Sequence, residues 1–255
     1  MGTVTADRII QRPATSEPVW RQWLSEADLH SAAIEDHLSP GVRLVVVAPH
    51  PDDEVLACGA LLTAQAARGG RCAVVAVTDG EASHGLSNPG STERLAATRR
   101  AESVSGLDLL GIPEGGIHRL RLADSRVAEQ GDRLLAQLHD LLEVDDVVVT
   151  TWRLDGHPDH EATGLATARA CKAIGCRLLE APVWMWHWAA PGDARVPWHR
   201  LSRMSVTSQE SSRKQAALSC HASQLGQWGA GQGPILDATM VERAARLSEY
   251  FFLNE

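Results

Sequence analysis

The chain lacks the features of a disulfide-stabilised protein. It contains five cysteines, an odd number, and no CxxC pair occurs among its 255 residues. A disulfide framework needs paired cysteines, and structural zinc sites usually carry closely spaced ones. Neither is indicated here, and a reducing cytoplasm is the expected location.

Long apolar runs and basic runs are also absent. No apolar stretch reaches the roughly 18 to 20 residues of a membrane span, and residues 1–18 contain Asp7, Arg8 and Arg12 without a continuous apolar core. The formal charge is −8, and no cluster of Lys and Arg offers a basic face to phosphates. We therefore expect a soluble protein that is not secreted, does not span a membrane and does not bind nucleic acid.

The length and composition suit one domain with one large core. Hydrophobic residues make up 44% of the 255 residues, which is enough for a single α/β domain. We predict an N-terminal extension over residues 1–39, in which apolar residues 20–34 recur at the spacing of an amphipathic helix. Residues 40–255 would form the domain, and a homo-oligomer remains possible.

From residue 43 onward, strand patterns alternate with helix patterns. We predict strands at 44–48, 72–77, 117–122 and 147–151, helices at 55–67, 92–105, 125–142, 158–174 and 239–251, and loops at 78–91 and 226–233. This alternation predicts a three-layer, Rossmann-like α/β fold, with a mostly parallel sheet and helices on both faces.

Two clusters of metal-ligand residue types directly follow predicted strands. Residues 49–54 read Pro-His-Pro-Asp-Asp-Glu, and residues 157–160 read His-Pro-Asp-His. Either cluster alone would also suit a solvated turn or a helix cap. However, ligands of open α/β sheets bind beyond the carboxyl ends of strands, where both clusters fall. Catalytic zinc usually has three protein ligands plus water, so His157 or His160 could complete a site begun by His50.

The two clusters also suggest a division of labour. Adjacent Asp52 and Asp53 point in different directions, so one can bind a metal while the other handles a proton. Pro158 suits the first helical position, which makes His157 the predicted N-cap and places His160 one turn into the helix. A helix N-terminus disfavours an imidazolium whereas nearby carboxylates favour it, so the protonation of His157 stays open.

With these residues in this order, the chain resembles the PIG-L (LmbE-like) family of zinc-dependent N-deacetylases. Further shared features are Thr78-Asp79-Gly80-Glu81, Arg99 with Glu102, and the late pattern Lys214, Ala217, His221 and Ser223-Gln224. The likeness covers about residues 43–225. It implies a metal-dependent hydrolase that removes an N-acyl group, commonly N-acetyl, from an amino-sugar-containing small molecule or glycoconjugate.

The resemblance also implies roles for individual residues. His50, Asp53 and His160 would hold Zn²⁺, with Fe²⁺ or another divalent metal as an alternative. Asp52 would be the general base, and His157 would stabilise the developing oxyanion. A metal-dependent amidase or esterase acting on a non-sugar substrate, or a noncatalytic binding homologue, are the alternative functions.

Two further positions resemble substrate contacts of the family. These are Arg99 and Asp124, for which a surface salt bridge and a helix N-cap are the respective alternatives. Some members also place a Tyr near the His-Pro-Asp-His motif. Here the only Tyr is Tyr250, and the corresponding loop contains Arg153 and Asp155 instead, so that role is not carried over.

The eight tryptophans are the remaining unusual feature. Trp184, Trp186 and Trp188 alternate, which predicts one face of a strand. Such a face could stack on a sugar, line an acyl pocket, anchor a partner subunit, or simply pack in the core. Of the nearby histidines, His187 is expected to be structural, and His84 to face solvent in a flexible loop.

Overall fold

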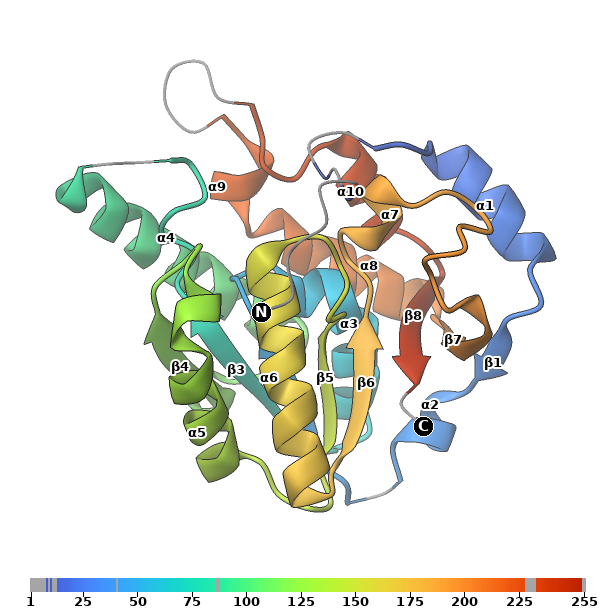
Figure 1. Cartoon of the computed structure of the whole chain (residues 1–255), viewed down its shortest axis with the longest axis horizontal. Helices are drawn as coiled ribbons and strands as arrows, with labels where there is room; N and C mark the ends of the chain where they lie inside the picture. Colours follow the sequence, from blue (N-terminus) through green and yellow to red (C-terminus); the bar gives the residue numbers. More distant parts are fainter. Residues whose placement is uncertain are drawn as a thin grey trace.

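An eight-stranded sheet organises the part of the chain that the structure describes. The structure is a computed structural model that describes residues 8, 10, 13–39, 41–85, 88–227 and 233–253. The strands are β1 (His30–Ala32), β2 (Leu44–Ala48), β3 (Cys72–Thr78), β4 (Ile117–Leu122), β5 (Val147–Thr151), β6 (Arg177–Ala181), β7 (Leu201–Ser205) and β8 (Ser248–Leu253). Their order across the sheet is β1-β7-β8-β6-β5-β2-β3-β4 (Figure 1). Strand β8 runs antiparallel to β6 and β7, and every other neighbouring pair is parallel.

Helices cover both faces of this sheet, which confirms the predicted fold class. The longer helices are α1 (Glu17–Glu26), α3 (Asp53–Ala67), α4 (Pro89–Leu109), α5 (Gly131–Leu141), α6 (Pro158–Ile174) and α8 (Ser208–Ser219). The short ones are α2 (Ile34–His37), α7 (Met185–Trp188), α9 (Ala222–Leu225) and α10 (Ala238–Ala244). Figure 1 shows α5 and α6 on one face of the sheet, with α3 and α8 behind the other.

The alternating side chains of β2 explain why this strand is central. Val45 and Val47 pack in the apolar cluster beneath α5 and α6, whereas Leu44 and Val46 belong to the cluster beneath α3. Side chains of a strand point alternately to opposite faces, so a run that is apolar throughout is buried on both sides. All five residues of β2 are buried.

The strand order creates a switch point beside β2. From β2 the chain continues to β3 and β4 on one side, and it returns to place β5 and β6 on the other. Ligands of such sheets bind where the direction of winding reverses, outside the carboxyl ends of the strands. The Pro-His-Pro-Asp-Asp-Glu turn follows β2, and the His-Pro-Asp-His motif begins α6 just after β5.

Most predicted elements of the parallel part are confirmed, but three predictions outside it are wrong. The N-terminal helix ends at Glu26, and the following residues form β1, which pairs with β7. The last helix ends at Ala244 and gives way to β8. Residues 184–188 are not a strand, because Met185–Trp188 form α7. In the first two cases distant strands supply the pairing partners, which local periodicity does not reveal.

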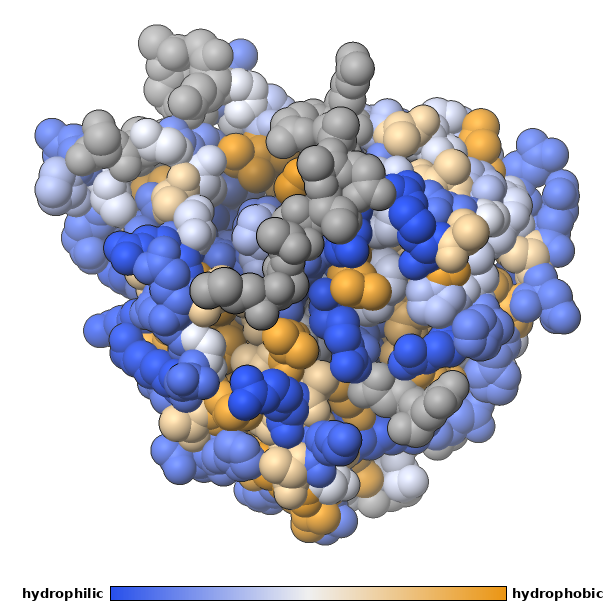
Figure 2. All heavy atoms as spheres, viewed as in Figure 1, coloured by the Kyte–Doolittle hydropathy of each residue, from blue (hydrophilic) through white to orange (hydrophobic). Residues whose placement is uncertain are grey.

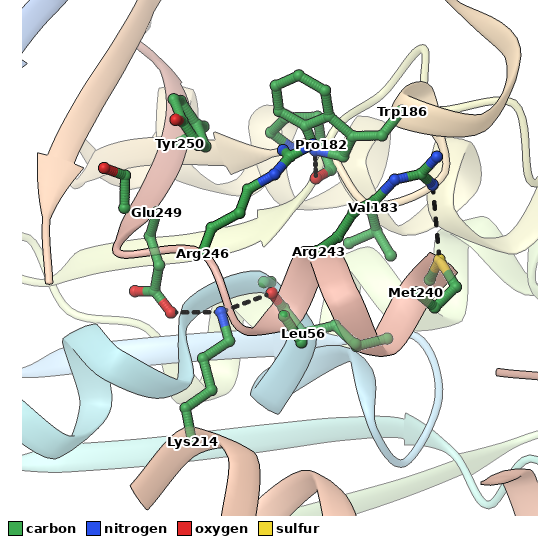
Figure 3. A pocket seen from close by; sticks show the side chains of 13 residues that line it. Leu56, Pro182, Val183, Trp186, Lys214, Met240, Arg243, Arg246, Glu249 and Tyr250 are labelled. Atoms are coloured by element: carbon green, nitrogen blue, oxygen red, sulfur yellow. Dashed lines mark hydrogen bonds and ion pairs between the residues drawn. The ribbon is translucent and has the colours of Figure 1, made fainter. Parts of the chain in front are cut away.

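Helix α3 is broken in a way that involves two distant charged residues. Cys58 has non-helical torsion angles, with φ −153° and ψ 32°. Glu249 of β8 accepts hydrogen bonds from the amides of Ala60 and Leu61, both at 2.9 Å, just after the break. Lys214 of α8 donates to the carbonyl of Leu56 at 3.0 Å and pairs with Glu249 at 2.7 Å (Figure 3). The ion pair thus satisfies backbone groups that the break leaves without helical partners.

Among the described residues, no helix combines the length and apolar character needed to cross a bilayer. Figure 2 shows hydrophobic residues scattered among hydrophilic ones on the face that carries α5 and α6. All five cysteine thiols are free.

Candidate active site

The turn between β2 and α3 is strained and firmly held. Asp52 has a φ of 127°, a backbone conformation that is costly for a residue with a side chain. Its amide donates to Glu54 at 3.0 Å, and Glu54 also accepts from the hydroxyl of Ser103 at 2.9 Å. The Thr78 hydroxyl donates to the carbonyl of Pro49 at 2.8 Å. Glu54 therefore stabilises the turn from within rather than capping the helix.

Asp53 brings two histidines together from the two motifs. Its Oδ2 atom lies 3.1 Å from His50 Nδ1 and 3.2 Å from His160 Nε2. The ligand atoms of a tetrahedral zinc site, each about 2.0–2.2 Å from the ion, lie roughly 3.3–3.6 Å from one another. His160 Nε2 is buried without a hydrogen bond of good geometry, as expected of a metal ligand. Asp53 therefore lies between the two imidazoles, and all three residues offer donor atoms of the kinds that a divalent cation binds.

The charges in this group are strongly coupled. Burial lowers the pKa of His160, but Asp53 and Asp155 outweigh it and raise that pKa to about 9. Burial likewise opposes ionisation of Asp53, yet the two histidines hold its pKa below the ordinary value. Protons shared between these side chains would be displaced when a cation binds.

His50 also faces a second group of carboxylates. Its Nε2 atom lies 3.3 Å from Asp124 Oδ1 and 3.4 Å from Asp159 Oδ2. By proximity, His50 could share a metal ion either with Asp124 and Asp159 or with His157 and His160. No local pattern in the sequence indicated that Asp159 approaches His50. The carboxylate of Asp159 also accepts from the amides of Ser125 and Val127, so it ties this loop to α6.

Arg99 is a buried partner of Asp52, so the surface salt bridge considered for it is wrong. It is 2% exposed. It donates to Asp52 Oδ2 at 3.0 Å and to the carbonyls of Pro51 and Gly80 at 2.6 and 2.9 Å. Gly80 has a φ of +69°, and a Cβ atom there would lie 2.0 Å from Arg99 Nη1. The glycine of the Thr-Asp-Gly-Glu motif therefore leaves room for the guanidinium.

The environment of Asp52 makes its proton affinity suitable for acid and base chemistry. Burial raises its pKa, Arg99 lowers it, and the nearby carboxylates of Asp53 and Glu54 raise it, to about 7 overall. A group with a pKa near the working pH can both accept and return a proton.

His157 caps α6, as predicted, and the cap determines its tautomer. Its Nδ1 atom accepts from the amide of Asp159 at 3.2 Å. Burial lowers the pKa of His157 well below its ordinary value, and the charges of His160 and His50 lower it further. A neutral ring whose Nδ1 accepts must carry its proton on Nε2. His157 can therefore donate one hydrogen bond while it remains uncharged.

Asp124 is not the helix cap that was considered for it. It is 7% exposed, and the 3₁₀ helix after it begins at Val127 with Arg126 in the cap position. Its Oδ2 accepts from the amide of Ala82 at 2.7 Å. Burial raises the pKa of Asp124, but the contact with His50 outweighs this and holds that pKa below its ordinary value.

The tryptophans divide between the core and the site. Trp186 and Trp188 are buried in an apolar cluster with Trp20 and Trp152. Trp184 instead lines the same cavity as His50, Asp53 and His160. Its ring is nearly parallel to that of His157, with centroids 6.4 Å apart and an interplanar angle of 23°.

The cavity is lined by both polar and apolar residues. Ser83, Asp124, Ser125 and Gln224 contribute polar groups, whereas Leu56, Trp184, Ile235 and Leu236 contribute apolar ones. Gln224 belongs to the late pattern shared with the family, but no role in the site was predicted for it. Leu56 and residues 235–236 were not assigned to the site either, since no local pattern marks them. Within the segment Gly226–Gly233, residues 228–232 lie outside the described residues.

The structure also corrects the prediction for His84. It was expected to face solvent, but it is 3% exposed, and its Nε2 contacts the carbonyl of Ser223 at 2.9 Å. His187 is structural, as predicted. It is buried, and its Nδ1 contacts the guanidinium of Arg243.

Comparison with known sequences gives a consistent result. The profile of the PIG-L family, described as GlcNAc-PI de-N-acetylase, matches residues 45–171. The uncharacterized deacetylase YaiS of Escherichia coli (strain K12) is 33% identical over 138 residues, 51% of this chain and 69% of that protein. A 1D-myo-inositol 2-acetamido-2-deoxy-alpha-D-glucopyranoside deacetylase of Corynebacterium glutamicum (strain R) is 32% identical over 145 residues, 47% of this chain. The match spans 49% of that protein, about half of its length.

A solved structure extends the likeness over more of the chain. The antimicrobial reagent A40926 pseudoaglycone deacetylase Dbv21 superposes with a TM-score of 0.60 and 25% identity, covering 83% of this chain and 96% of that one. The chain belongs to the PIG-L family.

Proposed function

We propose that this chain is a metal-dependent N-deacylase that removes an N-acyl group, in particular N-acetyl, from an amino-sugar-containing small molecule or glycoconjugate. The observation that carries the proposal is the arrangement around Asp53. His50 and His160 lie within 3.2 Å of its carboxylate. Asp52 and His157 line the same cavity. Zinc is the proposed metal because two imidazoles and one carboxylate suit it, with Fe²⁺ as the alternative.

The side chains have separate tasks in the proposed reaction. A divalent ion held by His50, Asp53 and His160 would supply Lewis-acid activation of water and of the amide carbonyl. Asp52, oriented by Arg99, accepts a proton from the attacking water and passes it to the departing amine. His157 donates its Nε2 proton in a hydrogen bond to the oxygen that gains charge. One water is consumed, and a carboxylic acid and an amine are released.

The walls of the cavity suggest how a substrate would lie. Asp124 and Ser125 offer acceptors and donors for sugar hydroxyls, and we propose Asp124 as a direct substrate contact. Arg99 already donates to Asp52 and two carbonyls. We therefore propose that it acts on the substrate mainly through Asp52.

The function can be tested with a panel of N-acyl amino-sugar conjugates and matched non-sugar amides and esters. Mass spectrometry would identify which compounds lose the acyl group, and assays for free amine would separate amide from ester hydrolysis. We expect turnover of amino-sugar amides by the metal-loaded protein and none by Asp52→Ala. Preferential hydrolysis of non-sugar compounds would support the amidase or esterase alternative. Metal-dependent ligand binding without turnover would support a noncatalytic homologue.

A further inference from the structure

Asp155 is a buried carboxylate with an unusual set of partners. It is 0% exposed. Its Oδ2 atom lies 2.8 Å from His160 Nδ1 and accepts from the amide of Trp184 at 2.9 Å. Its Oδ1 atom accepts from the amides of Val183 and Met185, both at 2.9 Å. A carboxylate has about four acceptor positions, so its capacity is filled.

The contact between Asp155 and His160 determines which ring nitrogen of His160 faces Asp53. Because Asp155 can only accept, His160 donates through Nδ1, and its Nε2 is left facing Asp53 at 3.2 Å. A carboxylate behind a metal-binding imidazole commonly fixes the ring orientation and increases its strength as a ligand.

The other contacts of Asp155 hold the backbone segment that carries Trp184. Three successive backbone amides, of residues 183–185, converge on Asp155. The ring of Trp184 neighbours two imidazoles, with its centroid 6.4 Å from that of His157 and 4.9 Å from that of His187. The segment that carries Trp184 is thus anchored to the same carboxylate that orients His160.

We propose that Asp155 is a positioning residue that couples the metal-binding imidazole of His160 to the Trp184 wall of the substrate cavity. This inference rests on the proposed metal-dependent function. An Asn side chain could not replace the carboxylate, because its single acceptor oxygen would leave its amide group facing backbone donors. Loss of the charge would therefore weaken both connections together.

The test compares Asp155→Asn with Glu180→Gln. Glu180 is a matched control, because it is 1% exposed and binds the amide and side chain of Arg153 on the same loop. Zinc affinity would be measured by competition with a chromogenic chelator. We expect Asp155→Asn to bind zinc about 10–100-fold more weakly, with Glu180→Gln within about twofold of the wild type.

Hydrogen exchange measures the second connection without reference to turnover. We expect the amides of residues 183–185 to exchange faster in Asp155→Asn than in the wild type, and to be unchanged in Glu180→Gln. A folded Asp155→Asn with normal zinc affinity and normal protection would overturn the proposal. A wild-type protein that binds no divalent metal would instead contradict the proposed function.

Wild-type protein provides a check if Asp155→Asn does not fold. Nitrogen-15 NMR of the zinc-loaded protein should show the His160 proton on Nδ1 and no proton on Nε2. The opposite tautomer would show that Asp155 does not orient the ring as proposed.

Discussion

The two halves of the sheet contribute different things to the site. The half that contains β2 to β5, residues 44–174, supplies the side chains proposed to bind metal and move protons, all at or just beyond strand ends. The half formed by residues 177–253 supplies supports and walls. These include the Lys214–Glu249 pair at the break in α3 and the Trp184 segment. The reactive groups lie in two short motifs, whereas part of what supports them comes from far along the chain.

Removing a proposed metal ligand should have the largest effect on catalytic activity. We expect Asp53→Ala to lower kcat/KM by at least about 10⁴-fold, because Lewis-acid activation would be lost together with the metal. Metal content by inductively coupled plasma mass spectrometry would be measured alongside turnover. Asp140→Ala, an exposed position on α5, is the control. Retention of stoichiometric metal by Asp53→Ala would refute the ligand assignment.

Asp52→Asn should separate proton transfer from metal binding. We expect kcat to fall about 10²–10⁴-fold, the usual contribution of a positioned acid or base, while metal content stays at the wild-type level. Steady-state kinetics and metal analysis of the same preparation would measure both quantities. Asp140→Asn controls for a lost carboxylate. Unchanged turnover would exclude Asp52 as the base.

Lys214→Met tests the supporting half. The substitution leaves Glu249 buried without its cation, and breaking a buried pair in this way typically costs about 3–5 kcal/mol. Urea unfolding would measure the loss in the free energy of unfolding. Lys172→Met, on the exposed surface of α6, should change it by less than about 0.5 kcal/mol. Equal stability of the two variants would show that the Lys214–Glu249 pair does not stabilise the broken helix α3.

The smallest expected effect is a pH dependence at α1. Glu17 is 3% exposed and accepts two hydrogen bonds from Arg246, at 2.9 and 2.7 Å. Burial raises the pKa of Glu17, but Arg246 and Arg21 outweigh it and lower that pKa below its ordinary value of 4.5. Its stabilising contribution is therefore complete above pH 4.5 and is lost as the pH falls through the folded-state pKa.

Glu17→Gln should accordingly be less stable than the wild type by about 1.5–3 kcal/mol at pH 7, and the difference should shrink toward pH 3. Unfolding free energies across this range would measure it. Glu26→Gln, on the exposed side of α1, controls for one lost charge. A difference that grows on acidification would contradict the sign of the argument.

The predicted elements show why one half of the sheet could be predicted from the sequence and the other could not. Strands 44–48, 117–122 and 147–151 and helix 158–174 were predicted with the bounds that the structure has. Each carries its own apolar pattern and a turn or proline at its end. Strand β1 has only three residues, and both β1 and β8 pair with strands far away in sequence. The local apolar pattern therefore predicted helix for the residues that form β1 and β8.

The sequence by itself determined the α/β architecture and the two motifs at strand ends, because strand alternation and the order of His and Asp residues are local properties. Only the tertiary structure decided what surrounds them. It buried Arg99 against Asp52, turned Trp184 toward His157, and placed Asp155 behind His160. The first two contacts join residues far apart in the sequence, and the third depends on how the loop before α6 folds back, so all three depend on the packing that determines which side chains become neighbours.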